Sequence, residues 1–285
     1  MHGNKKSTMA SQSLITFVVP TYGADDVLIN NLLASPCLRT GHQHEVLVQR
    51  GYSSAAVAYN EALDRAKNDI VVFAHQDVIF PEAWMSQLDK TLENLHVTDP
   101  NWGVLGCWGA TRDGQARGCV YAPGPGLLGN PFGSPRIVQT LDEIVLILRR
   151  SSGLRFDQNL PHFHFYGTDI CLRAAEMGKR NYAIPAFCVH NTNHYLVLPK
   201  EFYECYHYIR RAWNAELPIQ TTCIRITKLG IPMYRRRLNE IILKYAAKKA
   251  FLSPRKRDVD ELVRQSELAW SDPSTAKCLT RNSLK

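Results

Sequence analysis

The sequence predicts an α/β fold in which helices cover a mostly parallel sheet. Short apolar runs typical of strands alternate four times with helical patterns along the first part of the chain. This alternation is the pattern of layered α/β folds. The strand-like runs are also continuously apolar rather than alternating, which is typical of strands buried on both faces.

Each element follows from its own local pattern. The first strand is predicted at 14–19, where a run of β-branched and aromatic residues ends at Pro20. Further strands are predicted at 45–49, 69–73, 102–108, 141–149 and 181–189. Helices are predicted at 26–35, 53–67, 84–95 and 170–177, with Gly178 closing the last. The segment 123–135 is so rich in Gly and Pro that we expect a loop, either a lid or a surface excursion.

Charge divides the chain into two parts. The 285 residues carry a formal charge of +8, and their composition is that of an ordinary globular protein. The first 199 residues hold 16 Lys and Arg against 17 Asp and Glu, whereas the remainder holds 18 against 9. We predict a disordered segment at 1–13, an α/β domain at 14–199 and a helical basic region at 200–285.

The basic region contains a predicted amphipathic helix at 234–251, with apolar residues on one face and Arg and Lys on the other. Such a helix is either a solvated face, a surface packed on the body, or a contact with an anionic membrane. No apolar run approaches the length of a membrane span, and the eight Cys are scattered without metal-site spacing. We expect a cytoplasmic protein whose membrane contact, if any, is peripheral and at the inner face.

Polar side chains end two of the predicted strands. His75 and Asp77 follow the strand at 69–73, and their spacing of two places both on one face. His190 ends the strand at 181–189. Carboxyl ends of parallel strands line the ligand crevice of open sheets, so a divalent metal or a diphosphate–metal complex fits here. The alternative is an ordinary polar turn at each strand end.

A second cluster precedes the helix at 170–177. It contains His162, His164 and Asp169. Asp169 suits either the N-cap of that helix or a general base directed into the crevice.

Five ordered segments carry a family resemblance. They are VVPTY at 18–22, AYNEAL at 58–63, VVFAHQDVIFPEAW at 71–84, YGTDICLRAAEMG at 166–178 and VHN at 189–191. Together they resemble family 2 glycosyltransferases of the GT-A fold, with a Rossmann-type nucleotide-sugar-binding domain. The closest likeness is to the streptomycin-biosynthesis-type branch, in which an HQD motif replaces DxD. The resemblance spans roughly residues 15–191.

The resemblance implies a role for each matched position. The implied metal ligands for Mn²⁺ or Mg²⁺ are His75, Asp77 and His190. The implied catalytic residues are Asp169 as base, with His162, His164 or Asp157 as its alternatives. The implied nucleotide-sugar contacts are Pro20, Thr21, Tyr22, Gln49, Ala58, Asn60, His75 and Gln76. The sequence departs from the family at Gln49 and Arg50, where most relatives have paired acids.

The implied function is metal-dependent transfer of a sugar, with inversion, from a nucleotide-sugar donor to a hydroxyl acceptor, as in polysaccharide biosynthesis. A UDP-sugar is the expected donor, and the acceptor is unknown. Two alternatives stay open: an inactive relative that binds partners through its basic C-terminal region, and a nucleotidyltransferase. The latter would need a basic Gly-rich phosphate loop, and residues 21–26 contain no Lys or Arg. Nucleic acid is not an expected partner.

Overall fold

The computed structural model describes residues 14–23, 25–39, 44–123, 125–192, 198–246 and 258–271. The segment expected to be disordered, 1–13, lies outside them, as does the end of the expected basic helix beyond 246. Within the described residues, no helix is both long and apolar enough to cross a membrane.

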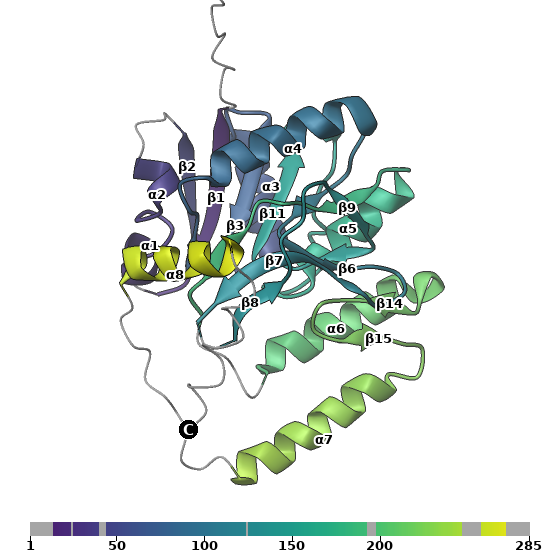
Figure 1. The fold of residues 1–285 in the computed structure, drawn as a ribbon. Helices are drawn as coiled ribbons and strands as arrows, with labels where there is room; N and C mark the ends of the chain where they lie inside the picture. Colours follow the sequence, from purple (N-terminus) through teal and green to yellow (C-terminus); the bar gives the residue numbers. More distant parts are fainter. Residues whose placement is uncertain are drawn as a thin grey trace, which may run out of the picture.

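The predicted α/β architecture is confirmed (Figure 1). A seven-stranded central sheet has the order β2 (Glu45–Arg50), β1 (Ile15–Thr21), β3 (Ile70–Ala74), β11 (Val145–Arg149), β5 (Leu105–Gly106), β12 (Asn181–Ala183) and β9 (Arg136–Val138). Strands β11 and β9 run against the other five, so the sheet is mostly parallel.

A second sheet lies beside it. Its order is β10 (Thr140–Leu141), β6 (Trp108–Ala110), β7 (Ala116–Ala122), β13 (Cys188–His190) and β4 (Val78–Ile79), and β8 (Gly126–Gly129) pairs with β7. A separate hairpin joins β14 (Ile219–Gln220) to β15 (Arg225–Ile226).

Helices enclose both faces of the central sheet. The helices of the described residues are α1 (Asp26–Ile29), α2 (Pro36–Arg39), α3 (Ala55–Arg65), α4 (Trp84–Thr98), α5 (Tyr166–Glu176), α6 (Lys200–Ala212), α7 (Ile231–Ala246) and α8 (Val259–Ser271). Short 3-10 turns span Arg150–Ser152 and Asn214–Glu216.

Strand β1 shows why the apolar runs are continuous. Ile15, Phe17 and Val19 pack in the core that contains α4, whereas Val18 packs in the core that contains α3, α5 and α6. Successive side chains of a strand point to opposite faces, so a strand covered on both faces must be apolar at nearly every position.

Two predicted strands are each divided between the sheets. The run at 102–108 becomes β5 and β6, which part at Cys107. The run at 181–189 becomes β12 and β13, with Pro185 between them. Proline lacks the N–H that a central strand needs, which explains the second break. Continuous apolarity did not reveal either change of sheet.

Two other expectations need correction. The segment 123–135 is not loop throughout, because it contains β8, an edge strand paired only with β7. Edge strands tolerate Gly and Pro better than central ones. The region after residue 200 is not helical throughout either, since β14 and β15 interrupt it, and the helix expected at 26–35 is only the four-residue α1.

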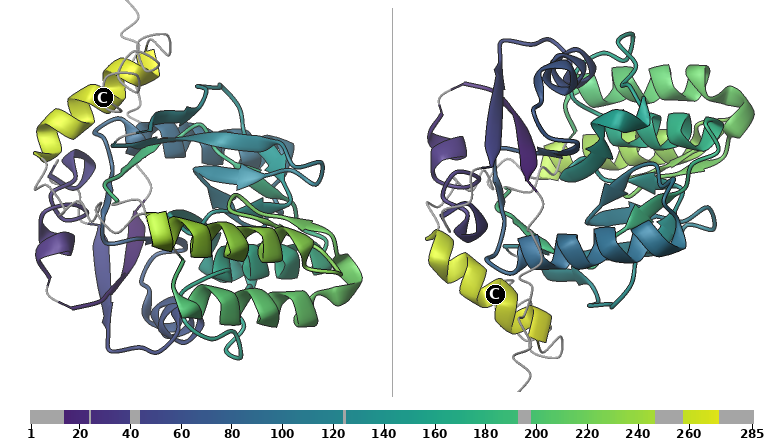
Figure 2. Two further views of the ribbon diagram at one scale, coloured as in Figure 1. Left: turned by 90° about the horizontal axis from the view of Figure 1, so that it is seen from below. Right: turned by 90° about the horizontal axis from the view of Figure 1, so that it is seen from above.

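The C-terminal region shares the cores of the body. Tyr206 and Ile209 of α6 are fully buried in the same cluster as α3 and α5. Helix α8 packs Leu262 and Val263 against Val189 of β13. Figures 1 and 2 show α8 beside the α1 end of the molecule and α7 alongside α6. Residue 199 therefore does not separate two independent cores.

Candidate functional site

His75, Asp77 and His190 meet at one end of β3. Strand β3 ends at Ala74, and β4 then pairs antiparallel with β13, which sets His190 opposite Val78. The ligand atoms of all three side chains lie within 4.8 Å of one another. The structure thus brings together three residues that the sequence placed at the ends of two different strands.

Tyr166 orients the His75 imidazole. The Tyr166 hydroxyl donates to the Glu143 carbonyl at 3.2 Å and lies 3.1 Å from His75 Nε2. Because that hydroxyl already donates its proton, it accepts one from His75 Nε2–H, which leaves the lone pair on Nδ1. A hydrogen bond of this kind fixes the tautomer of a metal-binding histidine.

The pKa shifts of His75 and Asp77 suit side chains that bind a cation. Burial, together with the neighbouring His190, lowers the pKa of His75 although Asp77 opposes this. Burial by itself would raise the pKa of Asp77, but the hydrogen bond and charge of His190 bring that pKa below its usual value. A neutral imidazole beside an ionised carboxylate is the protonation state that binds a cation.

The donor types fit a divalent transition metal. Mg²⁺ prefers oxygen ligands, whereas imidazole nitrogen suits first-row transition ions. Two imidazoles and one carboxylate therefore fit Mn²⁺ better than Mg²⁺.

An acidic pair that sequence reasoning missed lies next to this cluster. Strand β11 runs antiparallel to β3, so its beginning adjoins the end of β3, and His75 N–H donates to the Ile144 carbonyl at 3.2 Å. Asp142 and Glu143 precede Ile144 and line a small cavity with Thr168. The sequence signal for this acidic pair is two adjacent acids before an apolar run. The predicted strand at 141–149 includes both acids.

The Glu143 carboxyl has a strongly raised pKa. Burial, followed by the charge of Asp142, raises the pKa of Glu143 to about 8, although the backbone N–H groups of Gly167 and Phe165 oppose the shift. Gly167 permits this close packing, because a Cβ there would lie 2.8 Å from the Leu141 carbonyl oxygen.

Asp169, the expected base, is enclosed. Its side chain accepts from Arg173 Nε at 2.7 Å and from Trp213 Nε1 at 2.8 Å, and the residue is 0% exposed. Asp157, its alternative, pairs with Arg173 at 2.6 Å and accepts from Tyr208 at 2.7 Å. Both carboxylates link α5 to α6 instead of facing a crevice, so this geometry favours packing over catalysis for them.

The two histidines of that cluster take different positions. His162 Nε2 lies 2.7 Å from Glu204 of α6, and the His162 carbonyl accepts from Ala55 N–H. His164 is half-buried beside Phe202, and burial lowers its pKa to about 4. His162 therefore connects α6 with the start of α3, while His164 stays neutral at physiological pH.

The expected nucleotide contacts divide into two groups. Pro20 and Thr21 end β1, next to Gln49 of β2, and Tyr22 is 92% exposed. Gln49 is 2% exposed, and within the described residues neither polar atom of its amide has a hydrogen-bond partner. The Gln76 side-chain oxygen is likewise buried without a partner there. Buried amides are almost always paired, so the Gln49 amide needs an explanation.

Ala58 and Asn60 form the second group. Ala58 is fully buried in the core. The Asn60 amide donates to the Phe156 carbonyl at 2.9 Å and accepts from Phe156 N–H at 3.0 Å. Both side chains face the core side of α3, where they pack that helix against the body.

Known proteins similar to this chain include the following three. "ATP synthase subunits region ORF 6" of Fuscovulum blasticum is 29% identical over 137 residues, and the match spans 44% of this chain and about half, 53%, of that protein. The structure of S. aureus TarS 1-349 with UDP-GlcNAc matches with 14% identity and a TM-score of 0.46, over 70% of this chain and 66% of that one.

The third is the mannosyltransferase PcManGT from Pyrobaculum calidifontis with GDP-Man and Mn²⁺. It has 16% identity and a TM-score of 0.41, over 95% of this chain and 85% of that one. The family model named "Glycosyltransferase like family" matches residues 28–211, which run from α1 into α6 and include His75, Asp77 and His190. This match covers well over half of the chain, and the protein belongs to the glycosyltransferase-like family.

Proposed function

We propose that this protein is a metal-dependent, inverting glycosyltransferase of the GT-A fold, which moves a sugar from a UDP-sugar to a hydroxyl acceptor. One observation carries the proposal: His75, Asp77 and His190 converge at the strand ends of a member of a glycosyltransferase-like family. The HQD motif at 75–77 supports a place in the streptomycin-biosynthesis-type branch.

His75, Asp77 and His190 would hold the cation, and the two imidazoles favour Mn²⁺. A bound divalent cation supplies charge neutralisation for the diphosphate leaving group. Tyr166 keeps the His75 ring in the tautomer that serves as a ligand.

Gln49 is the residue we assign to the nucleotide. A buried donor or acceptor without a partner costs about 1–3 kcal/mol, so the Gln49 amide, which has no partner among the described residues, is expensive to bury without a ligand. An amide both donates and accepts, as does the edge of a nucleobase. Its position beside Pro20 and Thr21, at the carboxyl ends of β1 and β2, is where open sheets bind nucleotides.

Glu143 is the base that we propose in place of Asp169. As the acceptor oxygen bonds to the anomeric carbon, the bond from that carbon to the diphosphate breaks and Glu143 takes the hydroxyl proton. A pKa of about 8 matches a base that works near neutral pH. A single displacement of this kind inverts the anomeric configuration.

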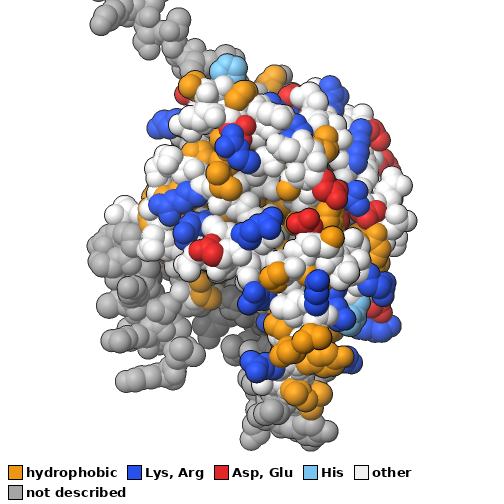
Figure 3. Space-filling view, turned by 90° about the vertical axis from the view of Figure 1, so that its right-hand side faces the viewer, with side chains coloured by type: hydrophobic (Ala, Val, Ile, Leu, Met, Phe, Trp, Pro, Cys, Tyr) orange, Lys and Arg blue, Asp and Glu red, His pale blue; other side chains and the backbone are white. Residues whose placement is uncertain are grey.

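Helix α7 supports a place at an anionic membrane surface. Ile231, Tyr234, Leu238 and Ile241 follow helical spacing and are 47–66% exposed. Arg235 and Arg237 flank this apolar stripe and are exposed too. Figure 3 shows hydrophobic side chains gathered with Lys and Arg at the lower end of the molecule. An apolar face bordered by cations is the pattern of interfacial helices, and it suits a lipid-linked acceptor met at the inner face of the membrane.

Calorimetric titration of UDP-glucose, UDP-N-acetylglucosamine and GDP-mannose, each with and without Mn²⁺, tests the core of the proposal. We expect Mn²⁺-dependent binding that Asp77→Asn abolishes. Asp64→Asn is the matched control, because Asp64 forms only an exposed ion pair with Arg155. Binding that needs no cation, or that survives Asp77→Asn, contradicts the assignment.

A further inference from the structure

A second cavity lies at the opposite end of α5 from His75. Tyr166, at the start of α5, contacts His75, whereas Leu172 and Ala175 line the cavity nearer the helix end. The 11 residues of α5 make a helix about 16 Å long, so the two places are separated by most of that length. The cavity has a volume of about 430 Å³, within the range of small-molecule sites.

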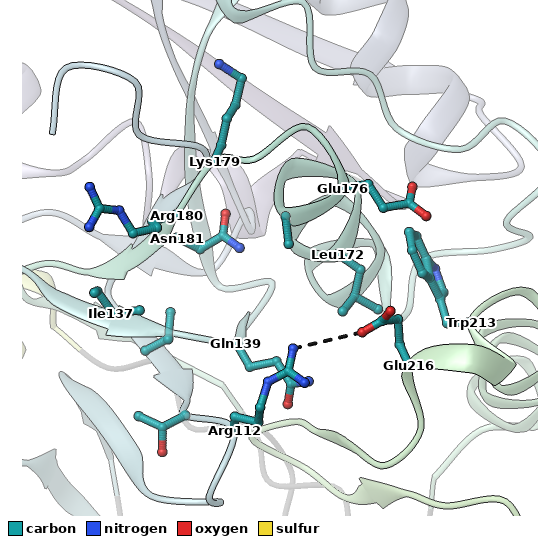
Figure 4. A pocket seen from close by; sticks show the side chains of 13 residues that line it. Arg112, Ile137, Gln139, Leu172, Glu176, Lys179, Arg180, Asn181, Trp213 and Glu216 are labelled. Carbon is teal, nitrogen blue, oxygen red and sulfur yellow. Dashed lines mark ion pairs between the residues drawn. The ribbon is translucent and has the colours of Figure 1, made fainter.

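Its inner walls are mainly apolar. Figure 4 shows Leu172 and Ile137 on either side and the Trp213 indole at one edge. Trp213 is held in place, because its Nε1 donates to Asp169. Trp213 is 7% exposed, so it adds a rigid apolar edge to the cavity at little cost in conformational entropy.

Eight of the thirteen residues that line the cavity are polar or charged, and they include both donors and acceptors. Gln139 accepts from Gln220 N–H through its Oε1, and within the described residues its Nε2 has no partner. Arg112 and Glu216 stand at the rim, 3.9 Å apart, with 76% and 44% of their side chains exposed. Glu176 adds a further carboxylate at the rim in Figure 4.

The charges do not suit an anion. Arg112 faces Glu216, and the two neighbouring cations are engaged outside the cavity: Arg180 with Asp99, and Lys179 with Asn101. Figure 4 shows both of these side chains directed away from its centre. A phosphate or nucleotide would find no unshared cation inside, whereas hydroxyl groups both donate and accept.

We propose that this cavity binds a neutral sugar unit of an oligosaccharide acceptor, remote from the reacting hydroxyl. The inference rests on the proposed function, which supplies a glycan as substrate. Apolar and aromatic walls match the C–H faces of a sugar ring, and Gln139, Arg112 and the rim carboxylates match its hydroxyls. Such a site would select oligosaccharides long enough to span the distance between the reacting hydroxyl and the cavity.

Saturation-transfer NMR with chitotetraose, cellotetraose and maltotetraose, in the absence of donor and metal, tests the proposal directly. At least one of these should give a signal with the wild-type protein. Ala175→Leu should remove it, because the added side chain projects from an exposed helical position into the cavity. Leu is nearly as good a helix former as Ala, so the fold is retained. Met177→Leu is the matched control, since Met177 is exposed on the same helix end outside the cavity.

A second variant, Arg112→Ala at the exposed rim, should weaken the same binding by about tenfold, the effect of losing one charge-assisted hydrogen bond. Asp77→Asn should leave oligosaccharide binding intact, and Ala175→Leu should leave nucleotide-sugar binding intact, so the two proposals fail separately. No signal from any of the three oligosaccharides, or equal signals from wild type and Ala175→Leu, overturns the inference.

Discussion

His190 Nε2 lies 3.4 Å from Asp77 Oδ1, although the two residues come from distant parts of the chain. The pairing of β13 with β4 creates this contact, and Asn191 N–H donates to the Asp77 carbonyl at 2.9 Å just beyond it. The backbone thus holds both side chains that we propose as ligands close together. Such preorganisation lowers the cost of ordering side chains on binding.

Glu143→Gln should slow transfer by about 10²–10⁴-fold while donor binding persists, because it removes a proton acceptor and keeps the shape of the side chain. The wild-type rate should rise with pH as Glu143 ionises around its pKa of about 8, and this rise should vanish in the variant. Steady-state kinetics across a pH series measures both effects.

Asp169→Asn is the variant to compare with Glu143→Gln. It breaks the enclosed pair with Arg173 and should lower the stability of the fold, with loss of activity following loss of folded protein. If instead the correctly folded Asp169→Asn protein loses turnover and Glu143→Gln does not, the base assignment reverts to Asp169.

Gln49→Met should make the protein more stable and its nucleotide binding weaker. Replacing an unpaired buried amide by an apolar side chain of similar volume removes a penalty of about 1–3 kcal/mol. Asn60→Leu is the matched control: both polar atoms of Asn60 are bonded to Phe156, so this change should destabilise the fold. Urea unfolding and UDP titration report the two effects, and a destabilised Gln49→Met variant would show that the amide has a structural partner.

Leu238→Glu should weaken binding to vesicles of phosphatidylcholine and phosphatidylglycerol by about tenfold or more, since burial of a Leu side chain contributes about 1.5–3 kcal/mol. Binding should also fall as salt is added, because Arg235 and Arg237 act through charge. Val97→Glu, an 82% exposed apolar residue on α4, is the control. Equal vesicle binding of Leu238→Glu and Val97→Glu in flotation would contradict membrane binding through α7.

Asp99 should contribute stability that is lost in acid. Burial by itself would raise the pKa of Asp99, but the hydrogen bonds from Tyr182 at 2.7 Å and Arg180 at 3.0 Å bring that pKa below its usual value. The unfolded chain therefore takes up a proton first, and the stabilisation present above about pH 4 disappears as the pH falls further. Urea unfolding of wild type and Asp99→Asn should converge at low pH, whereas Asp64→Asn should parallel the wild type throughout.

Much of the architecture was predictable because a strand that is buried on both faces has a continuously apolar sequence. The runs that became β1, β3 and β11 are continuously apolar, and these strands are adjacent in the interior of the sheet. The division of an apolar run between two sheets has no corresponding sequence pattern. Cys107 and its neighbours look like one strand, yet β5 and β6 pair with different partners.

The sequence by itself determined the α/β class, the strand ends that carry His75, Asp77 and His190, and the basic C-terminal helix. Only the tertiary structure decided which polar side chains face the site. Strand direction placed Asp142 and Glu143 beside His75, and the packing of α6 enclosed Asp169 with Trp213. The reason is physical: residue type and local period report burial and propensity, whereas the proximity of charged groups depends on strand pairing and helix packing between distant segments.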